Sequence, residues 1–162
     1  AIARRYSYTI SDGPADPLTR HSMYQQWRTL DVPAMQQAAQ PLLGLHDFTS
    51  YCKFYPTRSS IRTLQRFDWE RHGAVVTANL QADAFCQSMV RALVGAVLQV
   101  GQGLRPVEFP AQVLGRRRRE ADIETLPGHG LVLEEVFYPA NEQLGTRAAE
   151  TRARRDPSEL SD

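Results

Sequence analysis

The apolar residues of the chain change period along its length, and the period predicts which segments form strands and which form helices. Residues 5–10 alternate between apolar and polar side chains, as is typical of a strand with one buried face. Residues 61–69 and 74–82 alternate in the same way, and the short polar connection between them ends in a glycine, so they predict an antiparallel hairpin. A last strand is predicted over residues 131–138, where Pro139 stops it.

Three other segments have the helical period. Asp31 can cap a helix that Gly44 would end, and Pro41 within it implies either a last turn or a kink. Residues 84–100 have the clearest helical pattern of the chain, with two flanking ridges of apolar side chains. A shorter helix is predicted over residues 111–117.

The order of these elements is β-α-β-β-α-β with one extra short helix. It predicts an α+β domain with a ferredoxin-like antiparallel sheet and the helices packed on one face. We expect this domain to span residues 1–139. Residues 140–162 contain few apolar residues and no period, so they are expected to form a disordered tail. Many RNA-binding modules share this plan, but a fold alone does not assign a function.

Composition narrows the class of protein. With 162 residues, 42% of them hydrophobic and 23% charged, the chain is long enough for one globular domain with its own core. It has two cysteines, which form no CxxC pair, so neither a disulfide framework nor a zinc clamp is expected. Because no segment approaches the roughly 18 apolar residues of a membrane span, we expect a soluble protein of the reducing cytoplasm with no membrane partner. The chain begins with alanine rather than methionine, so it could be an excised fragment as easily as a processed whole.

Several kinds of active site can be excluded. The four histidines are scattered, and none lies at ligand spacing from a cysteine, carboxylate or second histidine, so no metal site is predicted. The sequence contains no P-loop, no GxSxG and no GxGxxG motif, and it lacks the aromatic signature of an RNA-recognition motif. The net charge is only +1, but Lys53 is the only lysine, so almost all positive charge is on arginine, which suits phosphate and stacking contacts.

Tyr6 and Asp47 are candidates for chemistry with structural alternatives. Tyr6 and Tyr8 share one face of the predicted strand, so they either fill the core or place a ring at a cleft edge, where it can stack on a flat ligand. Asp47 lies in a predicted polar turn, and we expect it to be a local cap rather than a catalytic base.

Arg91 lies in a polar stripe on the long predicted helix. The stripe consists of Gln87, Arg91, Gly95 and Gln99, spaced by four residues. An arginine in such a stripe is more often solvent-exposed. Gly95, however, costs helix stability and leaves room beside Arg91 for another backbone or for a ligand.

Five segments, in this order and spacing, resemble the C-terminal half of the tRNA pseudouridine synthase A (TruA) family. They are RRYSY, AAQPLLGLHDFTSY, IRTLQRFDWERHGAVVTANLQAD, AFCQSMVRALVGAVLQVGQG and GHGLVLEEVFYP, and together they run from about Arg4 to Pro139. The resemblance implies an enzyme that isomerises uridine to pseudouridine at positions 38 to 40 of the tRNA anticodon arm, without metal or organic cofactor, and that works as a homodimer with tRNA as its partner.

The resemblance also implies roles for two residues. Tyr6 corresponds to the tyrosine that packs on the target uracil, and Arg91 to the arginine that pairs with the nucleophilic aspartate. That aspartate belongs to an Arg-Thr-Asp motif of the N-terminal half, which this chain does not contain. The chain alone is therefore expected to be inactive. Gln87 and Ser88 depart from the family pattern, in which one or two histidines often precede Met-Val-Arg.

Three arginines near the first hairpin strand are candidates for phosphate contacts. These are Arg58, Arg62 and Arg66. Recognition of tRNA by shape depends on backbone charge, although a solvated basic strand face is equally consistent with this spacing. Two alternatives to an enzyme remain: a noncatalytic tRNA-binding or RNA-binding module of the same fold, and a ferredoxin-like domain that binds a small molecule.

Overall fold

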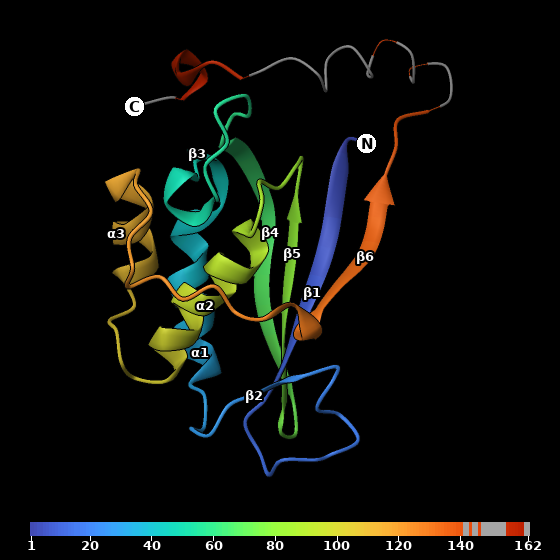
Figure 1. Cartoon of the computed structure of the whole chain (residues 1–162), viewed down its shortest axis with the longest axis vertical. Helices are drawn as coiled ribbons and strands as arrows, with labels where there is room; N and C mark the ends of the chain where they lie inside the picture. Colours follow the sequence, from blue (N-terminus) through green and yellow to red (C-terminus); the bar gives the residue numbers. More distant parts are fainter. Residues whose placement is uncertain (141–142, 144–145, 147–154, 161–162) are drawn as a thin grey trace.

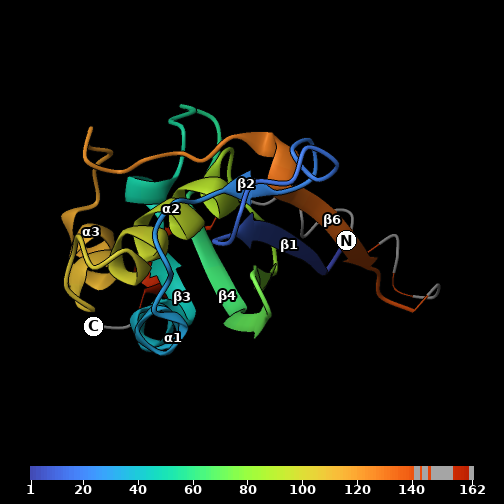
Figure 2. The ribbon, with the colours of Figure 1, turned by 90° about the horizontal axis from the view of Figure 1, so that it is seen from below.

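The computed structural model of the chain describes residues 1–140, 143, 146 and 155–160. A six-stranded sheet forms its centre, and Figures 1 and 2 show the three α-helices on the same side of that sheet. The strands are β1 (Ala3–Ser11), β2 (Tyr24–Gln25), β3 (Gly44–Asp47), β4 (Ile61–His72), β5 (Val75–Ala82) and β6 (Leu131–Phe137). The α-helices are α1 (Val32–Ala39), α2 (Met89–Gly101) and α3 (Phe109–Arg116). Short 3₁₀ helices are η1 (Gln40–Leu42), η2 (Thr49–Tyr51), η3 (Gly128–Gly130) and η5 (Pro157–Glu159).

The strand order is β2-β1-β5-β4-β3, and β6 pairs with β1 on the edge that β2 also occupies. Four of the strands, in the order β6-β1-β5-β4, pair antiparallel, as a ferredoxin-like β-α-β-β-α-β chain requires. The predicted α+β class and the predicted sheet are therefore confirmed. The two-residue β2 adds a parallel pair, and β3 extends the opposite edge.

Alternation along the strands positions the core. Ala78 of β5 pairs with Tyr8 of β1 on one side and with Trp69 of β4 on the other, and all three side chains are buried beneath the helices. The apolar side of α2 packs on this layer, with Leu93 and Val97 fully buried. Burial of this continuous apolar layer supplies the main driving force for joining sheet and helices.

The first helix is shorter than its apolar pattern suggests, and Pro41 is the reason. The Asp31 carboxylate accepts a hydrogen bond from the backbone N–H of Ala34 (3.1 Å), which confirms the predicted cap. The α-helix ends at Ala39, and the chain continues as the 3₁₀ helix η1, which contains Pro41.

Two further predicted boundaries are wrong. Residues 44–51, which we expected to form a polar turn, instead contain β3 and η2, because β3 gains backbone pairing with the distant strand β4. The long helix begins at Met89 rather than at residue 84, because Ser88 has a left-handed backbone conformation (φ 68°) that interrupts the helix.

The predicted tail, residues 140–162, falls largely outside the described residues. Residues 155–160 are described and include η5, and Arg155 pairs with the Asp83 carboxylate at the end of the hairpin (2.6 Å). Among the described residues, no helix combines the length and the apolar character needed to cross a bilayer.

Candidate active site

The polar stripe of α2 faces another part of the chain. Arg91, Gly95 and Gln99 lie against residues 122–126, which run in the opposite direction to the helix. The Nε2 of Gln99 donates to the carbonyl of Asp122 (3.1 Å), and a Cβ on Gly95 would lie only 2.1 Å from a carbonyl oxygen of the same segment. Four helical residues rise about 6 Å and two extended residues span about 6.6 Å, so side chains four apart can meet carbonyls two apart. The room that Gly95 leaves is therefore filled by backbone.

The guanidinium of Arg91 is held from two directions. Its Nη1 donates to the carbonyl of Leu126 (3.1 Å), and its Nη2 donates to the hydroxyl of Ser88 (3.3 Å). A guanidinium has five N–H donors, so these two bonds orient its plane and leave donors for a further acceptor. In the described part of the chain, Arg91 forms no ion pair with a carboxylate.

Tyr8 is tied to the same segment as Arg91. Its hydroxyl donates to the carbonyl of Pro127 (2.7 Å), next to the Leu126 carbonyl that Arg91 contacts. Burial and the neighbouring Tyr24 raise the pKa of the Tyr8 hydroxyl far above its ordinary value, and the positive charge of Arg91 acts in the opposite direction. Tyr8 is therefore a neutral structural donor.

Tyr6 lies two residues before Tyr8 on the same face of β1 and is only partly buried. Phe85 packs edge-on against it, with ring centroids 5.2 Å apart and an interplanar angle of 90°. This T-shaped contact is a favoured aromatic geometry, and it fixes the orientation of the Tyr6 ring. The sequence pattern had placed Phe85 within the long helix, whereas it precedes the helix and contacts β1.

Asp47 is a local cap, as predicted. Its carboxylate accepts hydrogen bonds from the backbone N–H of Thr49 (3.0 Å), from the Thr49 hydroxyl (2.6 Å) and from the hydroxyl of Ser60 (2.8 Å). Although burial acts to raise it, these hydrogen bonds hold the pKa of Asp47 below its ordinary value. The carboxylate is therefore ionised near neutral pH, and its Oδ1 accepts all three hydrogen bonds.

The three arginines chosen for phosphate contacts do not share a face. A β-bulge at residue 65 separates them: Leu64 pairs with Ala82 but Arg66 pairs with Gln81, so Arg66 faces the opposite side of the sheet from Arg62. Arg66 pairs with Asp68, which raises the pKa of its guanidinium.

Arg58 and Arg62 have different surroundings. Arg58 is exposed in the loop before β4, where its guanidinium lies 5.5 Å from the ring centroid of Tyr55. Burial lowers the pKa of Arg62, while the Asp83 carboxylate nearby acts to raise it. The alternative interpretation, one solvated basic strand face, is therefore wrong, because the bulge turns Arg66 to the side of the sheet opposite Arg62.

Three contributions to this region had little signal in the sequence. Ser88 and Phe85 contact Arg91 and Tyr6 from residues that the helical pattern had assigned to the long helix. The backbone carbonyls that accept hydrogen bonds in residues 122–127 belong to a segment without a sequence motif. Cys52 and Cys86 form a disulfide, a pairing that two isolated cysteines do not predict. Among the described residues, His, Cys, Asp and Glu side chains form no group of three suited to a metal ion.

Comparisons with known proteins place these residues in a family. Residues 38–139 match the family model described as tRNA pseudouridine synthase. The tRNA pseudouridine synthase A of Streptomyces griseus is 49% identical to this chain over 156 residues, which are 94% of this chain and 55% of that protein. Proteins of the same name from Frankia casuarinae and Leifsonia xyli are 48% and 47% identical, covering 97% and 96% of this chain and 58% and 55% of their own lengths.

The chain thus spans about half the length of the curated relatives it matches. The matched region begins in α1 and continues through the hairpin, Arg91 on α2, the 122–127 segment and β6. The family model and the relatives agree with the resemblance seen in the sequence motifs, and the chain belongs to the tRNA pseudouridine synthase family.

Proposed function

We propose that this chain is the C-terminal half of a tRNA pseudouridine synthase that converts uridine to pseudouridine at positions 38 to 40 of the anticodon arm. The nucleophilic aspartate comes from the rest of the protein, because the Arg-Thr-Asp motif of the family is absent from these 162 residues. The chain alone is inactive, and no metal or organic cofactor takes part.

The observation that best supports this proposal is the set of contacts that the Arg91 guanidinium makes. Its guanidinium is oriented by Ser88 and Leu126 but has no carboxylate partner among the described residues. A partly buried arginine with donors to spare fits a carboxylate that arrives from another part of the protein. Such a pairing keeps the aspartate ionised as the closed site desolvates it, and an ionised aspartate is the nucleophile that the reaction needs.

Tyr6 is proposed to pack on the target uracil. Its ring is fixed edge-on by Phe85 yet is only partly buried, so one face can receive a base that has rotated out of the RNA stack. Stacking on an aromatic ring is worth about 1–3 kcal/mol per base. That energy offsets part of the unstacking that base flipping costs.

Of the three candidate arginines, Arg58 has the surroundings that best support a phosphate contact, because it is exposed and has no carboxylate partner among the described residues. Arg62 and Arg66 remain predictions, Arg66 with its charge already shared with Asp68. The expected homodimer also remains a prediction, which sedimentation of the full-length protein would test.

Pseudouridine formation on an unmodified tRNA transcript tests the proposal, with this chain and the full-length protein assayed in parallel. We expect product only with the full-length protein. In that protein, Arg91→Ala should lower turnover about a hundredfold or more, the size of effect seen when one stabilising donor is removed from an active site. Arg91→Lys should also be impaired, because lysine cannot make the forked contacts.

Arg28→Ala is the matched control, since Arg28 is an exposed arginine in the connection between β2 and α1, away from Arg91 on α2. It should leave turnover unchanged. Near-normal turnover of Arg91→Ala would refute the role of Arg91. Salt-sensitive tRNA binding by the full-length protein without any pseudouridine would instead favour the noncatalytic binding module.

A further inference from the structure

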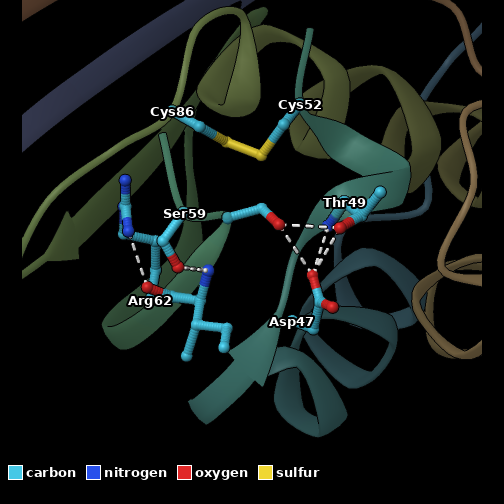
Figure 3. Close-up of a disulfide and its surroundings, with 8 residues drawn as sticks. Asp47, Thr49, Cys52, Ser59, Arg62 and Cys86 are labelled. Atoms are coloured by element: carbon cyan, nitrogen blue, oxygen red, sulfur yellow. Dashed lines mark hydrogen bonds between the residues drawn. A yellow bond between two sulfur atoms is a disulfide. The ribbon is translucent and has the colours of Figure 1, made fainter. Parts of the chain in front are cut away.

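The Cys52–Cys86 disulfide joins two connections that flank the proposed site. Its Cα atoms are 5.6 Å apart, although the two residues are 34 positions apart in the sequence. Cys52 follows η2, and Cys86 lies three residues before α2 begins. Figure 3 shows the disulfide above the hydrogen-bonded group of Asp47 and Thr49.

The start of α2 depends on this attachment. Ser88, at the N-cap position directly before the helix, has a left-handed conformation, and among the described residues no side chain caps the helix. A helix end without a cap has free N–H groups and frays easily. Here the backbone N–H of Met89 donates to the carbonyl of Cys86 (3.2 Å). The carbonyl of Gln87 accepts from the backbone N–H of Lys53 (3.0 Å), which attaches the residues before the helix to the connection that contains Cys52.

The attached segment contacts both proposed site residues. Phe85, next to Cys86, packs edge-on against Tyr6, and Ser88, two residues after Cys86, accepts the hydrogen bond from Arg91. The disulfide therefore restrains the chain between the residue that orients the tyrosine ring and the residue that orients the guanidinium.

The disulfide is also within reach of a small thiol. Both cysteines line a pocket of about 240 Å³. Exposed Lys53, Phe54 and Arg58 form part of the same lining, so the pocket opens to solvent beside the disulfide. A soluble dithiol can attack the disulfide through this opening.

We propose that Cys52 and Cys86 are positioning residues that form a redox-sensitive clamp on the segment holding Tyr6 and Arg91. The inference rests on the proposed function. Reduction by a dithiol breaks the Cys52–Cys86 bond: the dithiol gives two electrons and two protons, both cysteines become thiols, and the dithiol closes to its own disulfide. The Lys53–Gln87 hydrogen bond does not involve the sulfur atoms, so we expect reduction to loosen the segment without unfolding it.

The test uses the full-length protein, oxidised and then reduced with dithiothreitol, with thiols counted in both states. Reduction should lower kcat on tRNA about fivefold with a smaller change in KM, because the segment that loosens orients Tyr6 and Arg91 at the target base. C52S/C86S should match the reduced enzyme and should not respond to dithiothreitol, which controls for other cysteines of the full-length protein. Hydrogen exchange is measured alongside, and reduction should speed exchange in residues 84–92 but not in α3.

Each outcome is decisive. Free thiols at Cys52 and Cys86 in the untreated protein, or equal exchange in residues 84–92 before and after reduction, would overturn the clamp whether or not the protein is active. Equal kcat in the two states, with exchange altered, would overturn its link to catalysis. If exchange responds but neither state forms pseudouridine, the proposed function fails while the clamp stands.

Discussion

Replacing Gly95 with alanine should push residues 122–126 away from α2. The Cβ of alanine would lie 2.1 Å from the carbonyl oxygen of Glu124 and 3.1 Å from its carbonyl carbon, whereas real Cβ contacts essentially never fall below 3.0 Å. The oxygen belongs to backbone and cannot rotate away like a flexible side chain. Either the helix or the segment must therefore move by about 0.9 Å.

The loss of unfolding free energy can be worked out from the hydrogen bonds that this movement stretches and from the added methyl group. The Gln99–Asp122 and Arg91–Leu126 hydrogen bonds are both 3.1 Å long and lie on either side of Gly95, and each is worth about 1 kcal/mol. An extra methyl group in a packed site costs about 1–3 kcal/mol. Alanine regains about 1 kcal/mol through its higher helix propensity. We expect a net loss of about 2–4 kcal/mol and, for a chain of this size, a Tm lower by roughly 4–16 °C.

Thermal unfolding followed by circular dichroism measures this loss. Gly115→Ala is the matched control, because Gly115 is also helical and no described atom lies within 4 Å of its built Cβ. The control should be neutral or up to about 1 kcal/mol more stable. A Gly95→Ala protein that unfolds at or above the wild-type temperature would refute the contact between Gly95 and Glu124, and with it our explanation of how Arg91 is held.

Three further predictions concern single side chains. Tyr51→Phe removes a buried hydroxyl that donates to the Pro110 carbonyl (2.7 Å) and should cost about 1–2 kcal/mol in urea unfolding, whereas Tyr138→Phe, at an exposed ring, should cost nothing measurable. The Arg71 guanidinium holds the pKa of Asp12 below its ordinary value, so this pair contributes stability above about pH 4 that is lost as pH falls through the folded pKa. Asp12→Asn should therefore make the free energy of unfolding depend less on pH below about pH 4. An unchanged pH dependence would contradict the Asp12–Arg71 pairing. In the full-length protein, Tyr6→Phe should retain most turnover while Tyr6→Leu should lose about tenfold or more, since stacking needs only the ring; equal turnover would rule stacking out.

The local pattern of the sequence was sufficient for the central elements. Alternation predicted β1 and the β4–β5 hairpin, and Asp31 marked the start of α1. These features depend on residues within a few positions of one another, so a short window contains the whole cause. The ordered motifs around Tyr6 and Arg91 also sufficed to indicate the family.

Tertiary contacts decided the rest. The sequence showed that Gly95 left a vacancy beside Arg91, but only the fold placed residues 122–126 in it. The bulge that turns Arg66 away from Arg62 depends on pairing with β5, and the Cys52–Cys86 bond that precedes α2 depends on two segments 34 residues apart meeting in space. A periodic pattern records which side of an element is buried. It does not indicate which distant segment covers that side, because the covering segment depends on packing across the whole domain.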